Sequence, residues 1–390
     1  MKKKFLILTA DAGFGHRSAS NAVVKALEVL YGNQCECKIV NPAYEHSAPI
    51  FLRKPQLNYD KTVKNEAFYN FTYQISDKKF TAIIVNEAVA VFLYQTMFRL
   101  IMDYQPDAIL STYFFYPTPI KTILDVLHFR IPCFTIVTDL ANVHKFWFQQ
   151  SKEILFVPTE GVRREAIAFG FPENKIYVSG IPVSPSIFLE QRSKKEIRKD
   201  LGWNPDLKTI LIVSSRRVNH ILERVEMIDA SELPIQLIVV TGGDDSAFLE
   251  LKQRQWRHAI HVYNYVENVP EMMWAADILI SKAGGLIISE GLACGLPILL
   301  IDALPGQETG NVSFVYQNRV GVRVNSTQEM LETLQSWFSN QEALLKEYSQ
   351  NAAKIGKPDA ALKIAKIAWD SAQKNTLQSS NKYQSMVVTD

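Results

Sequence analysis

Hydrophobic positions fall in short runs that alternate with longer amphipathic stretches along the whole chain. The runs are continuously apolar, which is typical of strands that are covered on both faces of a sheet. Regular alternation of such strands with helical stretches predicts parallel, doubly wound α/β sheets. The predicted strands form two series: Phe5–Thr9, Cys37–Val40, Ala108–Ser111, Cys133–Val137, Leu155–Val157 and Ile176–Val178, then Ile210–Val213, Leu237–Thr241, His261–Tyr263, Ile278–Ile280, Ile298–Ile301 and Gly321–Val324.

Two series of strands predict two Rossmann-like domains, with a proline-rich break between them. We place the N-terminal domain at 1–185 and the C-terminal domain at 186–358. The charged run Arg192–Lys199 just beyond the break is interpreted as a solvated helix face. A last helix is predicted over 359–375, followed by a polar tail at 376–390.

Neither of two apolar stretches in the N-terminal half indicates a membrane span. The run that follows Met1 is too short for a signal peptide and leads at once into Asp11, so a first buried strand is predicted. The most apolar helical stretch, Ala88–Met102, is interrupted by Gln95 and Arg99 and is too short to cross a bilayer. Any membrane contact is therefore expected to be peripheral.

Composition narrows the class of protein. The 390 residues, 47% of them hydrophobic, suffice for two domains with sizeable cores. A net charge of +2 argues against a nucleic-acid partner, because such proteins usually carry a large basic excess. None of the four cysteines forms a Cys-x-x-Cys pair, which favours reduced thiols in a cytosolic protein.

A glycine loop after the first strand contains Gly13, Gly15 and His16 and opens a helix. It is not a dinucleotide fingerprint, because Ser18 stands at the third glycine position and the second strand ends in Asn41. Imidazole titrates near neutrality and can take a proton from an attacking alcohol. His16 is therefore a candidate general base; the alternative is a helix N-terminal residue without catalytic duty.

A second set of polar residues follows strands of the C-terminal half. Gly284-Gly285 opens a helix directly after a strand, where backbone N–H groups can bind an anion. Glu290 on that helix can accept hydrogen bonds from a ribose diol. Gln307 and Glu308 follow the next strand and are placed to bind sugar hydroxyls. Together these residues predict a nucleotide-sugar site.

A third motif, Val137–Phe148, follows a buried strand of the first half, where ligands bind in open α/β sheets. Asp139 is a candidate to orient His16 or to bind an acceptor hydroxyl. Trp147 and Phe148 are candidates to contact a ligand, and the alternative is a surface loop with a packed tryptophan.

The motifs Gly-x-Gly-His-Arg, Val-Thr-Asp-x-x-x-x-His-x-x-Trp, Ser-Glu-x-Leu-Ala-x-Gly-Leu-Pro and Pro-Gly-Gln-Glu-x-x-Asn resemble those of one family. They are similar to the monogalactosyldiacylglycerol synthases and processive diacylglycerol glucosyltransferases, which are related to the peptidoglycan N-acetylglucosaminyltransferase. The resemblance implies the GT-B fold, in which two Rossmann-like domains face a central cleft and the last helix crosses back to the N-terminal domain. It also implies an inverting hexosyltransferase that moves glucose or galactose from UDP-glucose or UDP-galactose to diacylglycerol.

The resemblance implies catalytic roles for His16 and Asp139. The implied donor-binding residues are Gly15, Ser215, Arg216, Gly242, Val266, Gly284, Gly285, Glu290, Gln307, Glu308 and Asn311. The implied acceptor-binding residues are Phe14, His144, Trp147 and Phe148. Neither a metal nor a cofactor is expected, because Arg216 and a helix dipole can meet the diphosphate charge.

Two departures from the family pattern leave alternatives open. The loop Ser214–His220 is less rich in glycine than its family counterpart, and Ser111–Pro117 lacks the histidine-proline pair of related enzymes. The alternatives are a UDP-GlcNAc transferase to an isoprenoid-linked acceptor and a non-catalytic UDP-sugar sensor. The basic and aromatic segment Phe51–Phe80 is expected to dock peripherally on an anionic membrane surface, at the cytoplasmic face.

Overall fold

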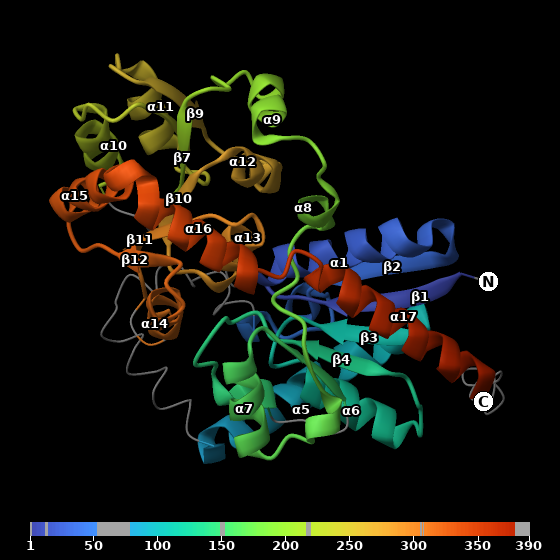
Figure 1. Cartoon of the computed structure of the whole chain (residues 1–390). Coiled ribbons are helices and arrows are strands. Elements are labelled where there is room, and N and C mark those ends of the chain that lie inside the picture. Colours follow the sequence, from blue (N-terminus) through green and yellow to red (C-terminus); the bar gives the residue numbers. More distant parts are fainter. Residues whose placement is uncertain are drawn as a thin grey trace. The chain divides into compact units, whose positions relative to one another are not determined.

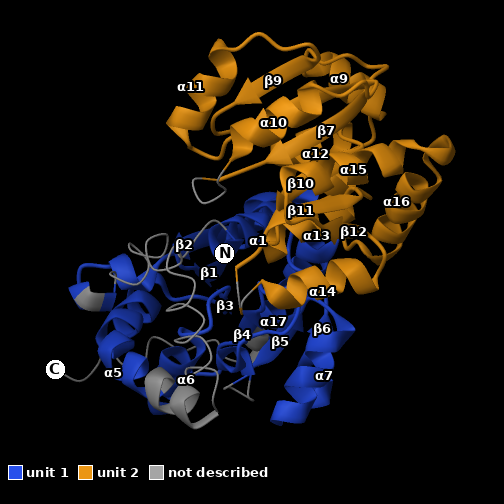
Figure 2. Cartoon of the chain, turned by 90° about the vertical axis from the view of Figure 1, so that its left-hand side faces the viewer, with its two compact units in different colours: residues 1–185, 359–390 blue, residues 186–358 orange. Residues whose placement is uncertain are grey.

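The computed structural model describes residues 2–11, 15–52, 79–148, 153–215, 220–304, 306 and 308–378. The chain divides into two compact units, unit 1 with residues 1–185 and 359–390, and unit 2 with residues 186–358 (Figures 1 and 2). Each unit contains one six-stranded sheet in which all neighbouring strands run parallel. The prediction of two Rossmann-like sheets is confirmed.

The sheet of unit 1 has the strand order β2-β1-β3-β4-β5-β6. The order reverses between β1 and β3, because β2 lies on one side of β1 and all later strands lie on the other. A reversal of this kind opens a crevice at the carboxyl ends of the two strands. The strands are β1 (Lys3–Leu8), β2 (Cys35–Val40), β3 (Ala108–Ser111), β4 (Cys133–Ile136), β5 (Ile154–Val157) and β6 (Ile176–Val178).

The sheet of unit 2 has the order β12-β11-β10-β7-β8-β9, and its order reverses between β7 and β10. Its carboxyl ends at β7 and β10 therefore form the corresponding crevice of this unit. The strands are β7 (Lys208–Val213), β8 (Ile235–Val240), β9 (Ala259–Tyr263), β10 (Ile278–Lys282), β11 (Ile298–Asp302) and β12 (Gly321–Arg323).

Helices connect and cover both sheets. The larger helices of unit 1 are α1 (Gly15–Tyr31), α5 (Lys79–Tyr104), α6 (Pro117–Val126), α7 (Glu160–Phe169) and α17 (Ala360–Gln378). The helices from the unit boundary onward are α8 (Pro185–Leu189), α9 (Lys194–Asp200), α10 (Ile221–Asp229), α11 (Asp245–Gln253), α12 (Val269–Ala275), α13 (Gly285–Ala293), α14 (Thr309–Gln317), α15 (Thr327–Phe338) and α16 (Ala343–Ile355). The last helix begins at Ala360 and extends to Gln378, three residues beyond its predicted end at 375.

The core of unit 1 has two layers, one on each face of its sheet. Phe5 and Ile7 of β1 pack with α1 and α17, whereas Leu6 and Leu8 pack with α5 and α6. This two-sided burial explains why the first strand is continuously apolar. Helix α17 lies along α1 (Figure 1), and its Trp369 stacks on Tyr31 with ring centroids 3.9 Å apart.

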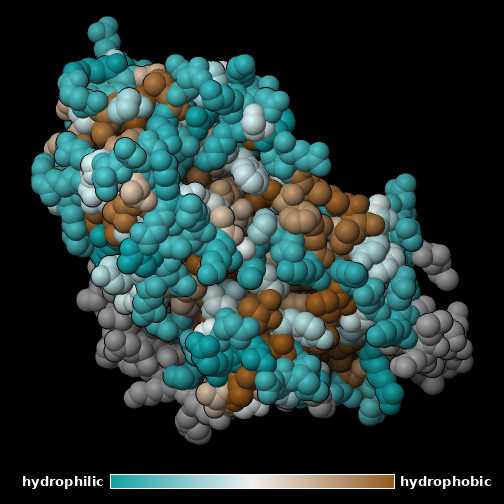
Figure 3. Space-filling model, in the orientation of Figure 1, coloured by the Kyte–Doolittle hydropathy of each residue, from teal (hydrophilic) through white to brown (hydrophobic). Residues whose placement is uncertain are grey.

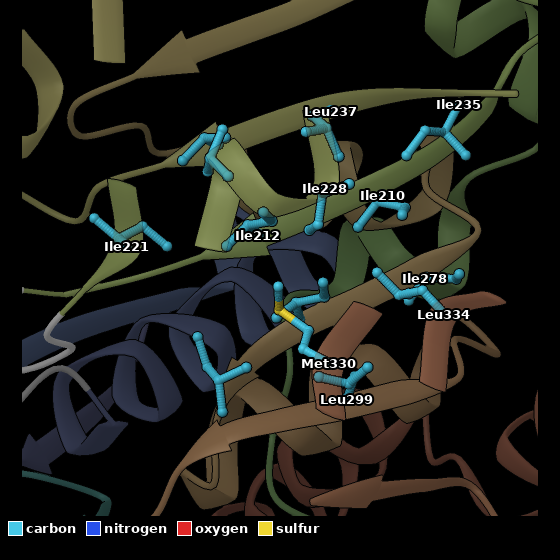
Figure 4. Packing of buried hydrophobic residues seen from close by; sticks show 14 of the residues in the cluster. Ile210, Ile212, Ile221, Ile228, Ile235, Leu237, Ile278, Leu299, Met330 and Leu334 are labelled. Carbon is cyan, nitrogen blue, oxygen red and sulfur yellow. The ribbon is translucent and has the colours of Figure 1, made fainter. Parts of the chain in front are cut away.

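The core of unit 2 joins three central strands to the helices on one face of the sheet. Figure 4 shows Ile210 of β7, Leu237 of β8 and Ile278 of β10 together with Ile228 of α10 and Leu334 of α15. All five side chains are fully buried. Complete burial of one such side chain stabilises a fold by about 1.5–3 kcal/mol, so this layer stabilises the packing of the sheet against α10 and α15.

The interpretation of Arg192–Lys199 as a solvated face is wrong for Arg198, which is 5% exposed. Its guanidinium donates to the Asp277 carboxylate at 2.6 Å and to the carbonyl oxygens of Ala275 and Leu207. A buried charge is tolerated when it is paired and hydrogen-bonded in this way. Arg198 thus fastens α9 to the segment between α12 and β10.

The described surface is mostly hydrophilic on the face that Figure 3 draws, and hydrophobic residues form smaller groups among the hydrophilic ones. Within the described ranges, no helix combines the length and apolar character needed to cross a membrane. The cysteines are free thiols as predicted, with Cys35 and Cys294 buried and Cys37 and Cys133 partly buried.

Candidate functional site

His16 lies where the strand order of unit 1 reverses. It is the second residue of α1, just after the loop that follows β1, while Thr112 directly follows β3 and Thr138 comes just after β4. Because the carboxyl ends of parallel strands share one edge of a sheet, these three residues come together there. The predicted position of His16 at a strand–helix junction is confirmed.

Two oxygen atoms face one ring nitrogen of His16. Its Nδ1 lies 2.8 Å from the backbone carbonyl oxygen of Thr112 and 2.9 Å from the hydroxyl oxygen of Thr138. A carbonyl oxygen can only accept a hydrogen bond, so Nδ1 carries the proton and donates a hydrogen bond to the Thr112 carbonyl oxygen. The other ring nitrogen, Nε2, then keeps its lone pair and can accept a proton.

Burial lowers the pKa of His16 below its ordinary value of 6.5, and this effect outweighs three influences that raise the pKa. Those influences are the charge of Asp139, the hydrogen bond with the Thr112 carbonyl and the charge of Asp11. The imidazole is therefore neutral at pH 7, as a general base must be before it acts.

Buried hydroxyl groups support the start of α1. The Thr112 hydroxyl lies 3.2 Å from the carbonyl oxygen of His16 and 3.0 Å from the Ser20 hydroxyl, and all three residues are buried. Sequence reasoning did not identify Thr112 or Thr138 as partners of His16. The available signal was a hydroxyl residue just after two neighbouring strands, at the edge where α1 begins.

Asp139 contacts Trp147, whose indole Nε1 donates to the aspartate Oδ2 at 2.8 Å. The hydrogen bonds that orient the His16 ring come from Thr112 and Thr138. Asp139 acts on His16 through its charge, which raises the pKa of the imidazole. In this structure Asp139 therefore influences the protonation of His16 through its charge, and the ring is oriented by the two threonines. The catalytic role of Asp139 stays a prediction.

The predicted acceptor-binding residues are mostly core residues. His144, Trp147 and Phe148 are 6%, 1% and 4% exposed, and Trp147 and Phe148 belong to the cluster over β5 and α7. Trp147 is packed as the alternative states, and the acceptor-binding roles of the three residues stay predictions. Phe14 lies outside the described residues.

In unit 2, the loops that follow the neighbouring strands β7 and β8 approach each other closely. Gly242 after β8 has φ +64°, and a Cβ there would lie 2.5 Å from the carbonyl oxygen of Ser214, which follows β7. Glycine is needed at this close approach. Ser215 and Val266 lie partly buried in loops after β7 and β9, whereas Arg216 and Gln307 fall outside the described residues.

A lysine that sequence reasoning missed lies beside the glycine turn. Lys282 ends β10, and its Nζ lies 3.6 Å from the position that a Cβ on Gly284 would take. Gly284 is the N-cap of α13 and Gly285 its first residue. An ammonium group and a helix N-terminus at one place suit an anion. A basic residue two positions before the glycine pair was the signal for it.

Glu308 is 5% exposed and its carboxylate is engaged within the protein. One oxygen lies 3.1 Å from Lys282 Nζ, and the other accepts from the backbone N–H of Leu304 at 2.8 Å. These contacts close the loop between β11 and α14. The predicted role of Glu308 as a sugar ligand stays a prediction.

Two acceptor groups near α13 have no hydrogen-bond partner among the described residues. Glu290 is half-buried, and burial raises its pKa to about 7. Asn311 donates through Nδ2 to the carbonyl oxygen of Ala283 at 2.8 Å, while its buried Oδ1 has no donor in the described parts of the chain. A buried acceptor without a donor, as at Asn311 Oδ1, is rare, and both groups suit a ligand that carries hydroxyl groups.

No group of three or more potential metal ligands occurs among the described histidine, cysteine, aspartate and glutamate residues. The expectation of chemistry without a metal or cofactor remains a prediction.

Known proteins resemble both units. Residues 16–183 match the family model of monogalactosyldiacylglycerol (MGDG) synthase, and residues 193–355 match that of glycosyl transferases group 1. The chloroplastic monogalactosyldiacylglycerol synthase of Spinacia oleracea is 31% identical over 375 residues, which cover 93% of this chain and 71% of that protein.

Solved structures share the fold at low sequence identity. The crystal structure of MurG from Acinetobacter baumannii has a TM-score of 0.58 at 14% identity and covers 94% of this chain and 100% of that one. The calicheamicin glycosyltransferase CalG4 has a TM-score of 0.59 at 12% identity and covers 98% of this chain and 100% of that one. These similarities confirm the GT-B fold, which by itself does not identify a reaction.

Proposed function

Because the chain belongs to the monogalactosyldiacylglycerol synthase family, we propose that it is an inverting glycosyltransferase that transfers glucose or galactose from a UDP-sugar to diacylglycerol. The observation that carries the proposal is the 2.8 Å contact between His16 Nδ1 and the backbone carbonyl oxygen of Thr112. The Nδ1 proton is held by the Thr112 carbonyl, so a neutral imidazole keeps Nε2 ready to accept a proton.

The reaction needs one proton transfer and one displacement. The acceptor hydroxyl donates a hydrogen bond to Nε2, and its oxygen attacks the anomeric carbon on the face opposite UDP. The new carbon–oxygen bond forms as the bond to the UDP oxygen breaks, and UDP leaves with the electron pair. The hydroxyl proton passes to Nε2, and the charges of Asp139 and Asp11 favour the imidazolium that results.

The donor would be held by unit 2. The N-terminus of α13 and the ammonium group of Lys282 suit the diphosphate, and they supply positive charge without a metal. The carboxylate of Glu290 would accept hydrogen bonds from the ribose. The unpartnered Oδ1 of Asn311 would accept one from a donor hydroxyl.

Measurement of UDP release tests the proposal directly. The full chain is incubated with UDP-glucose, UDP-galactose or UDP-GlcNAc, with and without diacylglycerol in detergent micelles, and the lipid product is identified by mass spectrometry. We expect release from a UDP-hexose that depends on diacylglycerol. Release from UDP-GlcNAc alone with an isoprenoid acceptor, or binding of UDP-sugars without any release, would contradict the proposal.

An insoluble acceptor requires the enzyme to reach a membrane. We therefore propose peripheral attachment to the cytoplasmic face through the segment Phe51–Phe80, of which residues 53–78 lie outside the described part of the chain. Each basic residue near an anionic surface contributes about 1 kcal/mol. Sedimentation with liposomes should show binding that increases with anionic lipid. Charge reversal at four basic positions of this segment should weaken it: Arg53, Lys54, Lys61 and Lys64. Binding that is insensitive to both changes excludes this segment as the docking surface.

A further inference from the structure

The segment after β3 reads Tyr113-Phe114-Phe115-Tyr116 and places a chain of aromatic rings beside His16. The Tyr113 ring meets the imidazole edge-on, with ring centroids 5.1 Å apart. The Phe114 ring lies 4.5 Å from Tyr113 and 5.4 Å from Trp147, whose own ring lies 6.3 Å from His16. A single ring therefore separates Phe114 from the proposed base in each of two directions: Tyr113 in one and Trp147 in the other.

The rings differ in exposure. Tyr113, Tyr116 and Trp147 are buried, whereas Phe114 and Phe115 are only partly buried. Phe115 lies 4.6 Å from Phe114, and it rests on the buried ring of Phe146 at 5.0 Å. The inner rings of the cluster are therefore buried, and its two outer phenylalanines are partly exposed.

The chemistry of this surface indicates which part of an acceptor it can meet. Phenyl rings offer neither N–H nor O–H groups, so a sugar or peptide lying on them would lose hydrogen bonds with water and gain none. Hydrocarbon loses nothing and gains from leaving water. In diacylglycerol the free hydroxyl is one carbon away from the carbon that bears the first ester, so acyl chains begin within about one ring width of the reacting oxygen.

We propose that Phe114 and Phe115 form the surface on which the acyl chains of a lipid acceptor begin, while the acceptor hydroxyl reaches Nε2 of His16. The inference rests on the proposed function and names the part of the acceptor that this surface binds. In this arrangement the buried ring of Trp147 packs against Phe114 and positions it. The residues that contact the lipid are then the two phenylalanines that follow β3, and the buried tryptophan of the Val137–Phe148 motif is a positioning residue.

Photochemical crosslinking tests this assignment without any catalytic step. The full chain is mixed, without donor, with diacylglycerol that carries a diazirine near the ester end of one acyl chain, in detergent micelles. After irradiation, labelled peptides are mapped by mass spectrometry. We expect the main label on the peptide that contains Phe114 and Phe115. A label confined to other peptides overturns the inference, and if UDP release still depends on diacylglycerol the proposed function stands.

Kinetics of matched variants provide the second readout. Phe115→Ser should raise the KM for diacylglycerol about tenfold or more and leave the KM for the UDP-sugar unchanged, whereas Phe115→Leu should largely restore it. Phe92→Ser on α5 is the control, because Phe92 is 48% exposed in the same unit. An equal rise in Phe92→Ser would indicate general attachment to micelles and contradict the inference. A wild-type chain with neither label nor UDP release would overturn the inference and the proposed function together.

Discussion

The two units place their candidate sites at the same topological position, yet they prepare these sites in opposite ways. In unit 1, both contacts of His16 Nδ1 are made by the protein, and its hydroxyl supports are buried. In unit 2, Glu290 and the Oδ1 of Asn311 have no partner among the described residues. A base must keep one tautomer through every turnover, whereas a donor site must leave its acceptors available for the ligand.

This difference between the two sites also affects the stability of the folded protein. The buried Oδ1 of Asn311 has no donor among the described residues, and such an atom costs about 1–3 kcal/mol of stability until it accepts a hydrogen bond. A ligand that donates to it stabilises the folded unit by mass action. The hydrogen bonds that orient His16 are already made, so the geometry of the base does not depend on a bound acceptor.

The largest expected effect comes from removing the base. His16→Ala should lower transfer by about two to four orders of magnitude, the usual contribution of general base catalysis. Folding and UDP binding should be intact, because the donor site belongs to the other unit. Circular dichroism and calorimetry with UDP serve as controls. Turnover close to that of the wild type in the purified variant would exclude His16 as the base.

Two substitutions should divide the donor site into a nucleotide part and a sugar part. Glu290→Ala should weaken UDP about tenfold or more, because it removes a hydrogen-bonded carboxylate from the ribose. Gln307→Ala should leave UDP affinity unchanged and weaken only the UDP-sugar. Isothermal calorimetry with UDP and with the UDP-sugar measures both. The division fails if the two variants lose UDP affinity equally.

The raised pKa of Glu290 predicts a pH dependence of donor affinity. Ribose hydroxyls that donate to this carboxyl favour its ionised form, so binding should tighten severalfold as pH rises from about 6 to about 8 and then level off. The UDP-sugar is the suitable ligand, because its diphosphate does not titrate in this range. Glu290→Gln should flatten the dependence. Affinity that falls with rising pH would contradict the ribose assignment.

The same carboxyl also links folding to pH. Its pKa is raised in the folded state, so the folded state binds the proton more tightly than the unfolded chain. The free energy of unfolding should therefore fall as pH rises from the ordinary value of 4.5 to about 7, and Glu290→Gln should remove this part of the decline.

The smallest expected effect is a shift of a pH profile. The charge of Asp139 raises the pKa of His16, so Asp139→Asn should lower that pKa and extend activity to more acidic pH. The amide oxygen of asparagine can still accept from Trp147 Nε1, so the loop should keep its structure. The acid limb of kcat/KM between pH 5 and pH 8 is the measurement. Movement of that limb to higher pH would show that Asp139 does not act through its charge.

Much of the fold could be predicted because buried parallel strands are continuously apolar. The bounds of β3 and β6 match the prediction, whereas the ends of most other strands are displaced by one or two residues. Strand β2 begins at Cys35, where it pairs with Lys3 of β1, although the apolar run begins later. Such ends are set by the pairing register with a neighbouring strand, and local hydrophobicity does not encode that register.

The candidate sites were predictable only in part, for a related reason. Residues just after strands meet at one sheet edge, which is why His16 and the glycine pair of α13 could be located. The tautomer of His16 depends on a backbone carbonyl, that of Thr112, and any residue type supplies a carbonyl. Trp147 lies in a loop after a strand, which is also where ligand-binding residues lie. Its packing is evident only from its hydrogen bond to Asp139 and from its burial.

The position of helix α17 along the chain affects how unit 1 folds during synthesis. The helix covers Ala22, Val23 and Ala26 of α1 through the buried alanines and isoleucine of its own inner face. The ribosome makes α1 before α17, with the whole of unit 2 between them. Unit 2 can fold as soon as it has emerged, whereas this apolar face of unit 1 stays uncovered until α17 has been made. The nascent N-terminal unit is therefore the part of the chain that most needs a chaperone.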